Sequence, residues 1–166
     1  MLAALVVLVA FLGGAAPTGA EPSAPDTGLV VRVVDGDTIH VRLGDRLEKV
    51  RYIGVNTPEV HHPRKAEQPG GDEAHAVNRR LVGGKRVRVE LDVRTRDRYG
   101  RLLAYVWVGA TMINAELVRL GYAQVMTIPP NVRHQALFLK LQRDAREAER
   151  GLWRRGASAS PSAHAR

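Results

Sequence analysis

Residues 29–43 read LVVRVVDGDTIHVRL, two apolar-rich runs on either side of an Asp-Gly-Asp turn. The run before the turn is rich in valine, and Ile39, Val41 and Leu43 alternate with polar residues after it. An Asp-Gly pair between two such runs is a strong hairpin signal, because glycine accepts the positive φ that a tight turn requires. This stretch therefore predicts a β-hairpin.

The rest of the chain predicts three more strands and three helices. A second turn at Gly44-Asp45 leads into a strand over 47–55, and two later segments have strand-like alternation or composition, 85–92 and 101–108. The helices are expected over about 72–82, about 112–120, and from near the capping residue Asn131 to Gly151. On the third helix, one apolar face recurs at helical spacing: Leu137, Leu141, Ala145 and Ala148. Five short strands with inserted and appended helices predict an α+β, mainly β, protein whose sheet curls into a small barrel.

Bulk properties limit the possible classes. The 166 residues favour one domain, and an apolar content of 45% excludes a wholly disordered chain. A formal charge of +8 attracts polyanions, whether they are bound, cut or only concentrated nearby. The absence of cysteine excludes disulfides, cysteine-ligated zinc and a thiol nucleophile.

The two ends of the chain predict processing and tails. The apolar run from Leu2 to Leu12, followed by small residues, predicts a signal peptide over 1–20 and hence export to the periplasm, cell surface or medium. An uncleaved membrane anchor is the alternative. Residues 21–28 are expected to be a disordered linker, 29–154 the folded domain, and 155–166 a disordered tail.

Three polar clusters carry the candidate chemistry: Asp35 to Thr38, Arg51 to Glu59, and Asp97 to Arg101. Taken singly, each is explained as a turn or strand end. Taken together, they supply what phosphodiester hydrolysis needs. Oxygen donors such as Asp37 and the Thr57 carbonyl suit Ca²⁺ or Mg²⁺, and Glu59 can take a proton from water.

Two arginines complete this set. Arg51 and Arg101 can each present a planar fork of donors to the non-bridging oxygens of a phosphate. Arg51 lies on the same predicted strand face as Ile53 and Val55, an unusual position for a charge unless that face opens at the mouth of the barrel. A zinc site at His61-His62 is a weaker reading, because no third histidine is suitably spaced.

The clusters also resemble a known family. The runs VVDGDT (33–38), RYIGVNTPE (51–59) and RDRYGR (96–101) are similar, in order and spacing, to the three signature segments of the staphylococcal nuclease (thermonuclease) family. The similarity covers roughly residues 29 to 154. It implies an OB-fold, a five-stranded β-barrel with three α-helices, in a monomer without a stable protein partner.

The resemblance also implies a reaction and its residues. Members hydrolyse DNA and RNA to products with 3′-phosphate ends, with one Ca²⁺ held in part by Asp37 and the carbonyl of Thr57. It implies that Glu59 is the general base and that Arg51 and Arg101 bind the phosphate. Substrate-binding roles follow for two more residues, Arg98 and Tyr99.

This chain departs from the family pattern at two places. Asn56 stands where the prototype has a second aspartate ligand, which predicts weaker Ca²⁺ binding through an amide oxygen. Met126-Thr127-Ile128 replaces a stretch with two tyrosines near the nucleotide base, so stacking on the base is not expected there. The alternative function is a non-catalytic OB-type module that binds nucleic acid. It does not require Glu59 beside a phosphate, and charge repulsion would disfavour that arrangement.

Overall fold

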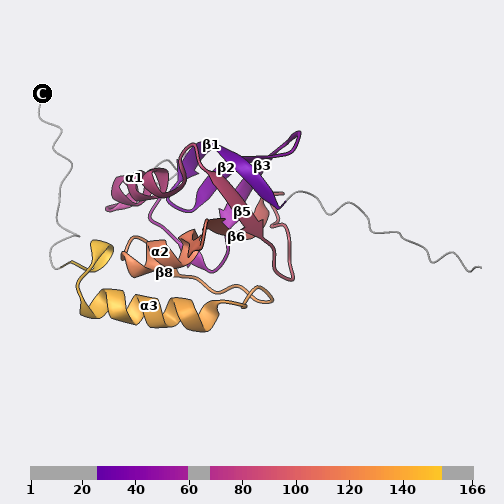
Figure 1. The fold of residues 1–166 in the computed structure, drawn as a ribbon. Helices are drawn as coiled ribbons and strands as arrows, with labels where there is room; N and C mark the ends of the chain where they lie inside the picture. Colours follow the sequence, from indigo (N-terminus) through magenta and orange to yellow (C-terminus); the bar gives the residue numbers. More distant parts are fainter. Residues whose placement is uncertain (1–25, 60–67, 155–166) are drawn as a thin grey trace, which may run out of the picture.

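The computed structural model describes residues 26–59 and 68–154 (Figure 1). The predicted hairpin forms β1 (Thr27–Asp35) and β2 (Thr38–Leu43), so β1 starts two residues before the expected domain boundary. The chain continues through β3 (Arg46–Tyr52), β4 (Val55–Asn56), α1 (Gly71–Val82), β5 (Arg86–Glu90), β6 (Leu102–Val108), β7 (Thr111–Met112), α2 (Ile113–Arg119), β8 (Gln124–Val125), α3 (Gln135–Glu147) and a 3₁₀ turn (Gly151–Trp153). The predicted leader, His61-His62 and the tail lie outside the described residues.

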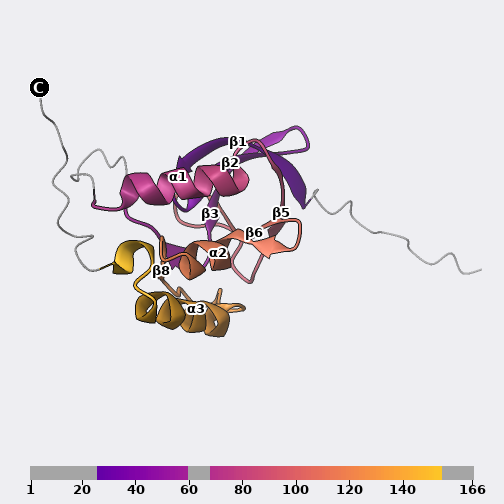
Figure 2. The ribbon, with the colours of Figure 1, turned by 60° about the vertical axis from the view of Figure 1, so that its left-hand side comes forward.

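The sheet closes on itself. Its strand order is β3-β2-β1-β5-β6-β7, and a further parallel pairing between β3 and β6 closes β3, β2, β1, β5 and β6 into a barrel. All other pairings in this sheet are antiparallel. The predicted five-stranded OB-type barrel with three helices is therefore confirmed. In both ribbon views α2 lies between the barrel and α3, while α1 lies beside β1 (Figures 1 and 2).

The strand expected over 47–55 is interrupted at Gly54. Gly54 has φ of 77°, and a Cβ built there would lie 2.7 Å from the Phe138 ring. A side chain at this position would therefore require both a strained backbone and a displaced helix α3. Beyond the turn, Val55 and Asn56 form β4 and pair with β8 instead of continuing along β2.

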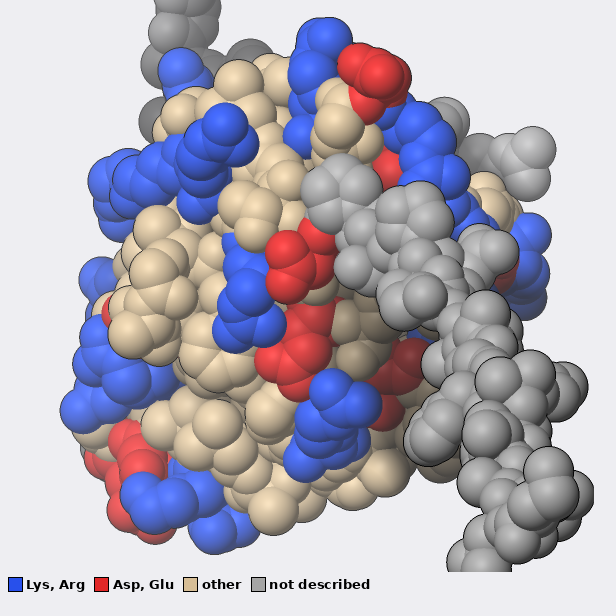
Figure 3. Space-filling view, turned by 45° about the vertical axis from the view of Figure 1, so that its right-hand side comes forward, with Lys and Arg blue, Asp and Glu red and all other residues tan. Residues whose placement is uncertain are grey.

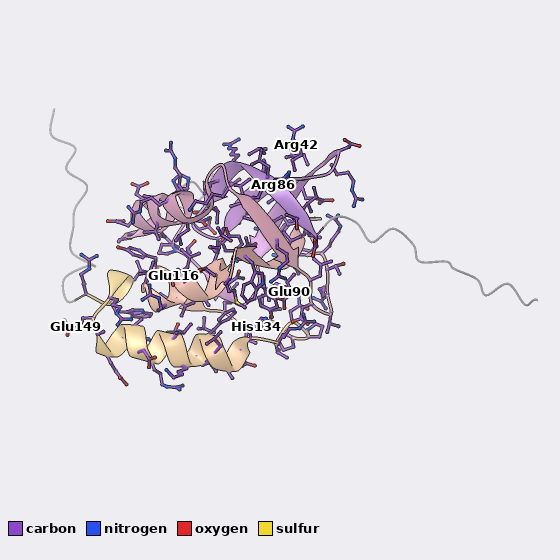
Figure 4. All side chains as sticks on the ribbon, viewed as in Figure 1. Arg42, Arg86, Glu90, Glu116, His134 and Glu149 are labelled. Carbon is purple, nitrogen blue, oxygen red and sulfur yellow. The ribbon has the colours of Figure 1, made fainter. Side chains whose placement is uncertain are left out.

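Helix α3 begins at Gln135, four residues after the expected cap at Asn131. The Asn131 side chain instead bonds to the backbone of Arg94: its Oδ1 accepts from the Arg94 N–H at 2.8 Å and its Nδ2 donates to the Arg94 carbonyl at 2.8 Å. His134, just before the helix, lies 3.0 Å from a carboxylate oxygen of Glu90 at the end of β5 (Figure 4). The start of the helix is therefore set by contacts with residues that are distant in the sequence.

The face of α3 that packs on the protein also differs from the expected one. Phe138 and Ala145 are buried and Leu141 packs against the core, whereas Leu137 is 41% exposed. The ring of Phe138 lies against Gly54, so a residue between the predicted positions makes the main contact.

Two buried asparagines attach helices to the barrel. Asn78 of α1 accepts a hydrogen bond from the Tyr52 hydroxyl at 2.9 Å and donates one to the Asp35 carbonyl at 2.9 Å. Asn114 of α2 donates to the Ile53 carbonyl and accepts from the Val106 N–H, each at 2.9 Å. Within the ranges 26–59 and 68–154, no helix is long and apolar enough to span a membrane.

Candidate active site

The first two polar clusters meet at Asp37. This aspartate lies in the turn between β1 and β2 and is buried. Its Oδ2 accepts a hydrogen bond from the Thr57 N–H at 2.9 Å and forms an ion pair with Arg51 Nη2 at 3.1 Å. Its Oδ1 accepts a bond from the Thr38 hydroxyl at 3.0 Å. The register of β2 and β3, which pairs Thr38 with Arg51, brings these groups together. The structure therefore brings Asp37 of the first cluster together with Arg51 and Thr57 of the second.

Arg51 is buried and fully engaged through its two terminal nitrogens. Nη1 donates to the carbonyls of Tyr52 and Val55, both at 2.8 Å. Nη2 donates to Asn56 Oδ1 at 3.1 Å and contacts Asp37. The guanidinium therefore holds the turn between β3 and β4 in place and directs Asn56 and Thr57 toward Asp37. Its orientation is set by fixed backbone carbonyls as well as by the carboxylate.

Asp35 and Glu59 add two more carboxyl groups beside Asp37. Burial raises the pKa of the Asp35 carboxyl to about 6, and the hydrogen bond to Glu59 and the charges of Asp37 and Glu59 add to the rise. The backbone N–H of Gly36, which donates to Asp35 at 2.8 Å, opposes it. Like charges are thus held close together at this end of the barrel, a situation that a bound cation would relieve.

The oxygen atoms here fit a hard cation such as Ca²⁺. A carboxylate has about four lone-pair positions, and Asp37 uses three of them, which leaves one on Oδ1. The Thr57 hydroxyl oxygen is buried without a hydrogen-bond partner. In the described ranges no group of three or more His, Cys, Asp and Glu side chains is arranged to hold a metal, and the predicted ligands include only one such side chain, Asp37.

The third cluster is organised by Asp97. Its Oδ1 accepts from the backbone N–H groups of Tyr99 and Arg101 at 2.9 and 3.0 Å, and its Oδ2 accepts from Arg101 Nε at 2.6 Å. Partial burial would raise the pKa of Asp97, but the hydrogen bonds from Arg101 and Tyr99 hold it below its usual value. An ionised Asp97 therefore fixes both the loop and the direction of the Arg101 side chain.

Arg98 and Tyr99 project from the tip of this loop. The guanidinium of Arg98 lies 4.7 Å from the centre of the Tyr99 ring and donates to its hydroxyl at 2.6 Å. The Tyr99 side chain is exposed. The pair presents a cation and an aromatic face to the solvent, which suits contact with a phosphate or a base.

A pocket of about 470 Å³ is lined by residues of the second and third clusters. They include Arg51 and Gly54 from the second cluster and Arg98, Tyr99 and Arg101 from the third, and Met126 and Ile128 also line the pocket. The parallel pairing of Arg51 with Leu103 places the two clusters next to each other. The structure thus gathers four of the predicted residues around one pocket: Arg51, Arg98, Tyr99 and Arg101. Asp37 and Asn56 adjoin it through Arg51, and Glu59 lies with Asp35.

Arg96 and Glu48 form a clamp that the sequence did not indicate. Arg96 Nη1 and Nη2 donate to the two carboxylate oxygens of Glu48 at 2.9 and 2.8 Å, and Nη1 also donates to the Gly100 carbonyl at 2.8 Å. The clamp joins the third cluster to β3, the strand that carries Arg51. The two residues are 48 positions apart, so no local pattern points to their pairing.

We expect Glu48→Gln to destabilise the fold slightly. The substitution removes a bidentate charge-assisted pair in which the Glu48 side chain is 12% exposed and the Arg96 side chain 46%, so the free energy of unfolding should fall by about 0.5–1 kcal/mol. Urea unfolding of both proteins under the same conditions measures the change. Glu116→Gln, which breaks an arginine pair on α2, is the matched control. Equal effects of the two variants would show that the clamp has no special role.

Comparison with known proteins agrees with this geometry. Residues 49–155 match the model of the family described as staphylococcal nuclease homologue. The chain is 36% identical over 157 residues to the thermonuclease of Staphylococcus hyicus, covering 92% of this chain and 93% of the relative. It is 35% identical over 156 residues to the thermonuclease of Staphylococcus intermedius, covering 93% of each. The endonuclease YncB of Bacillus subtilis is 36% identical over 124 residues, which covers 74% of this chain and 59% of the relative.

The match is carried by the whole domain and not by one motif. The barrel is closed as expected, and the first two polar clusters meet at Asp37 while the second and third face one pocket. The chain belongs to the staphylococcal nuclease family.

Proposed function

We propose that the protein is a Ca²⁺-dependent endonuclease that hydrolyses phosphodiester bonds in DNA and RNA and leaves 3′-phosphate ends. The observation that carries this proposal is the convergence of carboxylates and arginines. Asp35, Asp37 and Glu59 form an acidic group that contacts Arg51 through Asp37, and Arg101 lines the same pocket as Arg51. A nuclease needs both sets, because a cation and a base act on water while fixed donors hold the phosphate.

Each residue has a proposed role in this scheme. Asp37, Asn56 and the Thr57 carbonyl hold the cation, which polarises the phosphate when it is bound. Glu59 takes the proton from the attacking water. Arg101 donates to the non-bridging oxygens, and Arg98 with Tyr99 binds a neighbouring phosphate. Arg51 keeps the ligand turn in place and offers its Nε to the same phosphate.

The surface supports a polyanionic substrate. Figure 3 shows one face on which several groups of Lys and Arg side chains are distributed among uncharged residues, with fewer acidic side chains between them. The formal charge of +8 supports the same conclusion. A nucleic-acid-binding module without activity would use this charge equally well, but the acidic group beside Arg51 would repel the phosphates that it binds. The acidic group therefore favours the nuclease.

A cleavage assay tests the proposal. The protein is incubated with single-stranded DNA, duplex DNA and RNA, each with added Ca²⁺ or with a chelator. We expect Ca²⁺-dependent cutting, with products that a 3′-phosphatase can dephosphorylate. Binding without cutting under every divalent ion would favour the binding module. The predicted leader over 1–20 supports export of the enzyme, and N-terminal sequencing of the secreted protein tests that part.

We expect Asn56→Asp to tighten Ca²⁺ binding about three- to tenfold, because a carboxylate replaces a neutral oxygen donor. The new carboxylate would still accept the bond from Arg51 Nη2, so the turn should keep its shape. The midpoint of a Ca²⁺ titration, followed by cleavage rate and by calorimetry, measures the change. Gln124→Glu on the paired strand β8 adds the same charge and is the control. An unchanged midpoint would remove Asn56 from the ligand set.

A further inference from the structure

A second groove lies between β1 and α1, outside the pocket described above. It measures about 490 Å³ and is lined by the β1 residues Val30 to Val33 and by His75, Arg79, Gly83 and Gly84. Its charged groups are all basic: Arg32 from the strand and Arg79 from the helix, with His75 one turn before Arg79. The spacing of four residues places His75 and Arg79 on the same face of α1.

The two arginines of this groove, Arg32 and Arg79, are among those without a carboxylate partner in the described residues. Several arginines elsewhere lie within 3.8 Å of an Asp or Glu oxygen: Arg51, Arg88, Arg96, Arg101, Arg119 and Arg133. Neither Arg32 nor Arg79 has such a partner in the part of the chain that the structure describes. Their charges are therefore available to an external anion.

The positive charge beside the groove affects the pKa of a neighbouring histidine, His40. His40 of β2 pairs in register with Arg32 on one side and with Lys49 on the other. Partial burial lowers the pKa of His40, and the positive charges of Lys49 and Arg32 lower it further. Both neighbouring charges act in the same direction, so the positive field at this row is not neutralised locally.

The groove has a fixed position relative to the acidic group. Asn78, adjacent to Arg79 on α1, is bonded to the Asp35 carbonyl and to the Tyr52 hydroxyl. Arg32 precedes Asp35 by three residues on β1, a distance of roughly 10 Å at about 3.3 Å per residue. Stacked nucleotides advance about 3.4 Å each along a strand. A strand that is cut beside the acidic group would thus reach the groove after about three nucleotides.

The negative end of the α1 dipole does not oppose an anion here. α1 ends at Val82, beside the groove, where unpaired carbonyls would repel a phosphate. Lys85 Nζ donates to the carbonyls of Arg80 and Leu81 at 3.0 and 2.9 Å. This lysine covers the helix end with a positive charge.

We propose that the groove between β1 and α1 binds the phosphodiester backbone of the substrate strand, about three nucleotides from the bond that is cut, through Arg32 and Arg79. The proposal rests on the proposed nuclease function for the position of the cut. It makes the groove a second phosphate site that recognises length and charge and not base sequence. Short substrates would not reach it.

The test compares Arg32→Gln/Arg79→Gln with a control that loses the same charge, Arg80→Gln/Arg143→Gln. Arg80 is next to Arg79 on α1, and Arg143 is exposed on α3. Binding of a single-stranded 12-mer is measured with a chelator present, at several salt concentrations. We expect the groove variant to bind at least about tenfold more weakly near 50 mM salt and to lose about 1.4 from the slope of log K against log salt, since each contact to a single strand contributes about 0.7. An equal loss in the control would mean that only net charge matters, and no loss in the groove variant would overturn the proposal.

A second arm separates this proposal from the nuclease function. Cleavage of a dinucleotide and of the 12-mer is followed with Ca²⁺. The groove variant should lose about tenfold in kcat/KM on the 12-mer and keep the dinucleotide rate within about twofold. Equal losses on both substrates would overturn the proposal. If the unaltered protein cuts neither substrate, the nuclease function fails, while the binding arm still decides whether the groove holds a nucleic-acid backbone.

Discussion

Replacing Glu59 with glutamine should lower kcat for single-stranded DNA by about 10²–10⁴, the range typical for loss of a general base. Glutamine has the same size and retains hydrogen bonding, but it cannot accept a proton from water. The Glu59 backbone should be unaffected, because its N–H and carbonyl bond to Gln68 at 3.2 and 3.1 Å without involving the side chain. Binding of DNA should therefore persist, or tighten slightly as a negative charge is lost.

Single-turnover kinetics at saturating DNA measures the chemical step, and a binding assay with a chelator gives the affinity separately. Glu147→Gln, an exposed acid at the end of α3, loses the same charge far from the pocket and is the control. A kcat within a factor of about three of the original protein would exclude Glu59 as the base. A parallel loss of DNA affinity would instead indicate that Glu59 acts by organising the acidic group with Asp35.

The barrel could be predicted because its signals are local. The Asp-Gly turn, the alternation in 85–92 and the β-formers in 101–108 each depend on neighbouring residues, and β1, β2, β5 and β6 follow them closely. The three polar clusters could also be assigned to strand ends and turns. Their convergence followed from the family resemblance, since the parallel pairing of β3 with β6 joins segments far apart in the chain.

What the sequence could not show depends on contacts between distant residues. The ring of Phe138 occupies the space beside Gly54, which ends β3 earlier than its apolar pattern suggests. Asn131 has the composition of a helix cap, but its side chain bonds to Arg94 and the helix starts later. Asp35 was visible only as part of a turn, and its raised pKa depends on burial and on Glu59.

Arg51 has contacts that the sequence did not indicate. Its planar donors predicted a fork onto a phosphate, and that role stays a prediction. The structure shows that both terminal nitrogens are bonded to carbonyls, to Asn56 and to Asp37. Arg51→Ala should therefore reduce stability as well as activity. The acceptors that Arg51 bonds would stay buried without a hydrogen-bond partner, which costs about 1–3 kcal/mol for each of them.

Arg101→Ala should give the second large effect, a loss of about 10² or more in kcat, with little change in stability. Arg101 differs from Arg51 in the hydrogen bonding of its terminal nitrogens. Only its Nε is bonded, to Asp97, and within the described residues both terminal nitrogens lack a hydrogen-bond partner. They face the pocket with Arg51 and are free to hold the phosphate oxygens as charge develops. The remaining Asp97 carboxylate still accepts the backbone N–H groups of Tyr99 and residue 101, so the loop should keep its shape.

Arg101→Lys sharpens this prediction, because lysine keeps the charge and loses the fork. If positioning of two donors matters, the lysine variant should be nearly as slow as the alanine variant. If charge alone matters, it should recover most of the rate. Thermal unfolding distinguishes Arg101 from Arg51: the Tm of Arg101→Ala should stay within about 3 °C of the original protein, whereas that of Arg51→Ala should fall by at least about 5 °C. A large fall in Tm for Arg101→Ala would show that its contact with Asp97 supports the fold, and the kinetic loss would then not identify a group that touches the reacting phosphate.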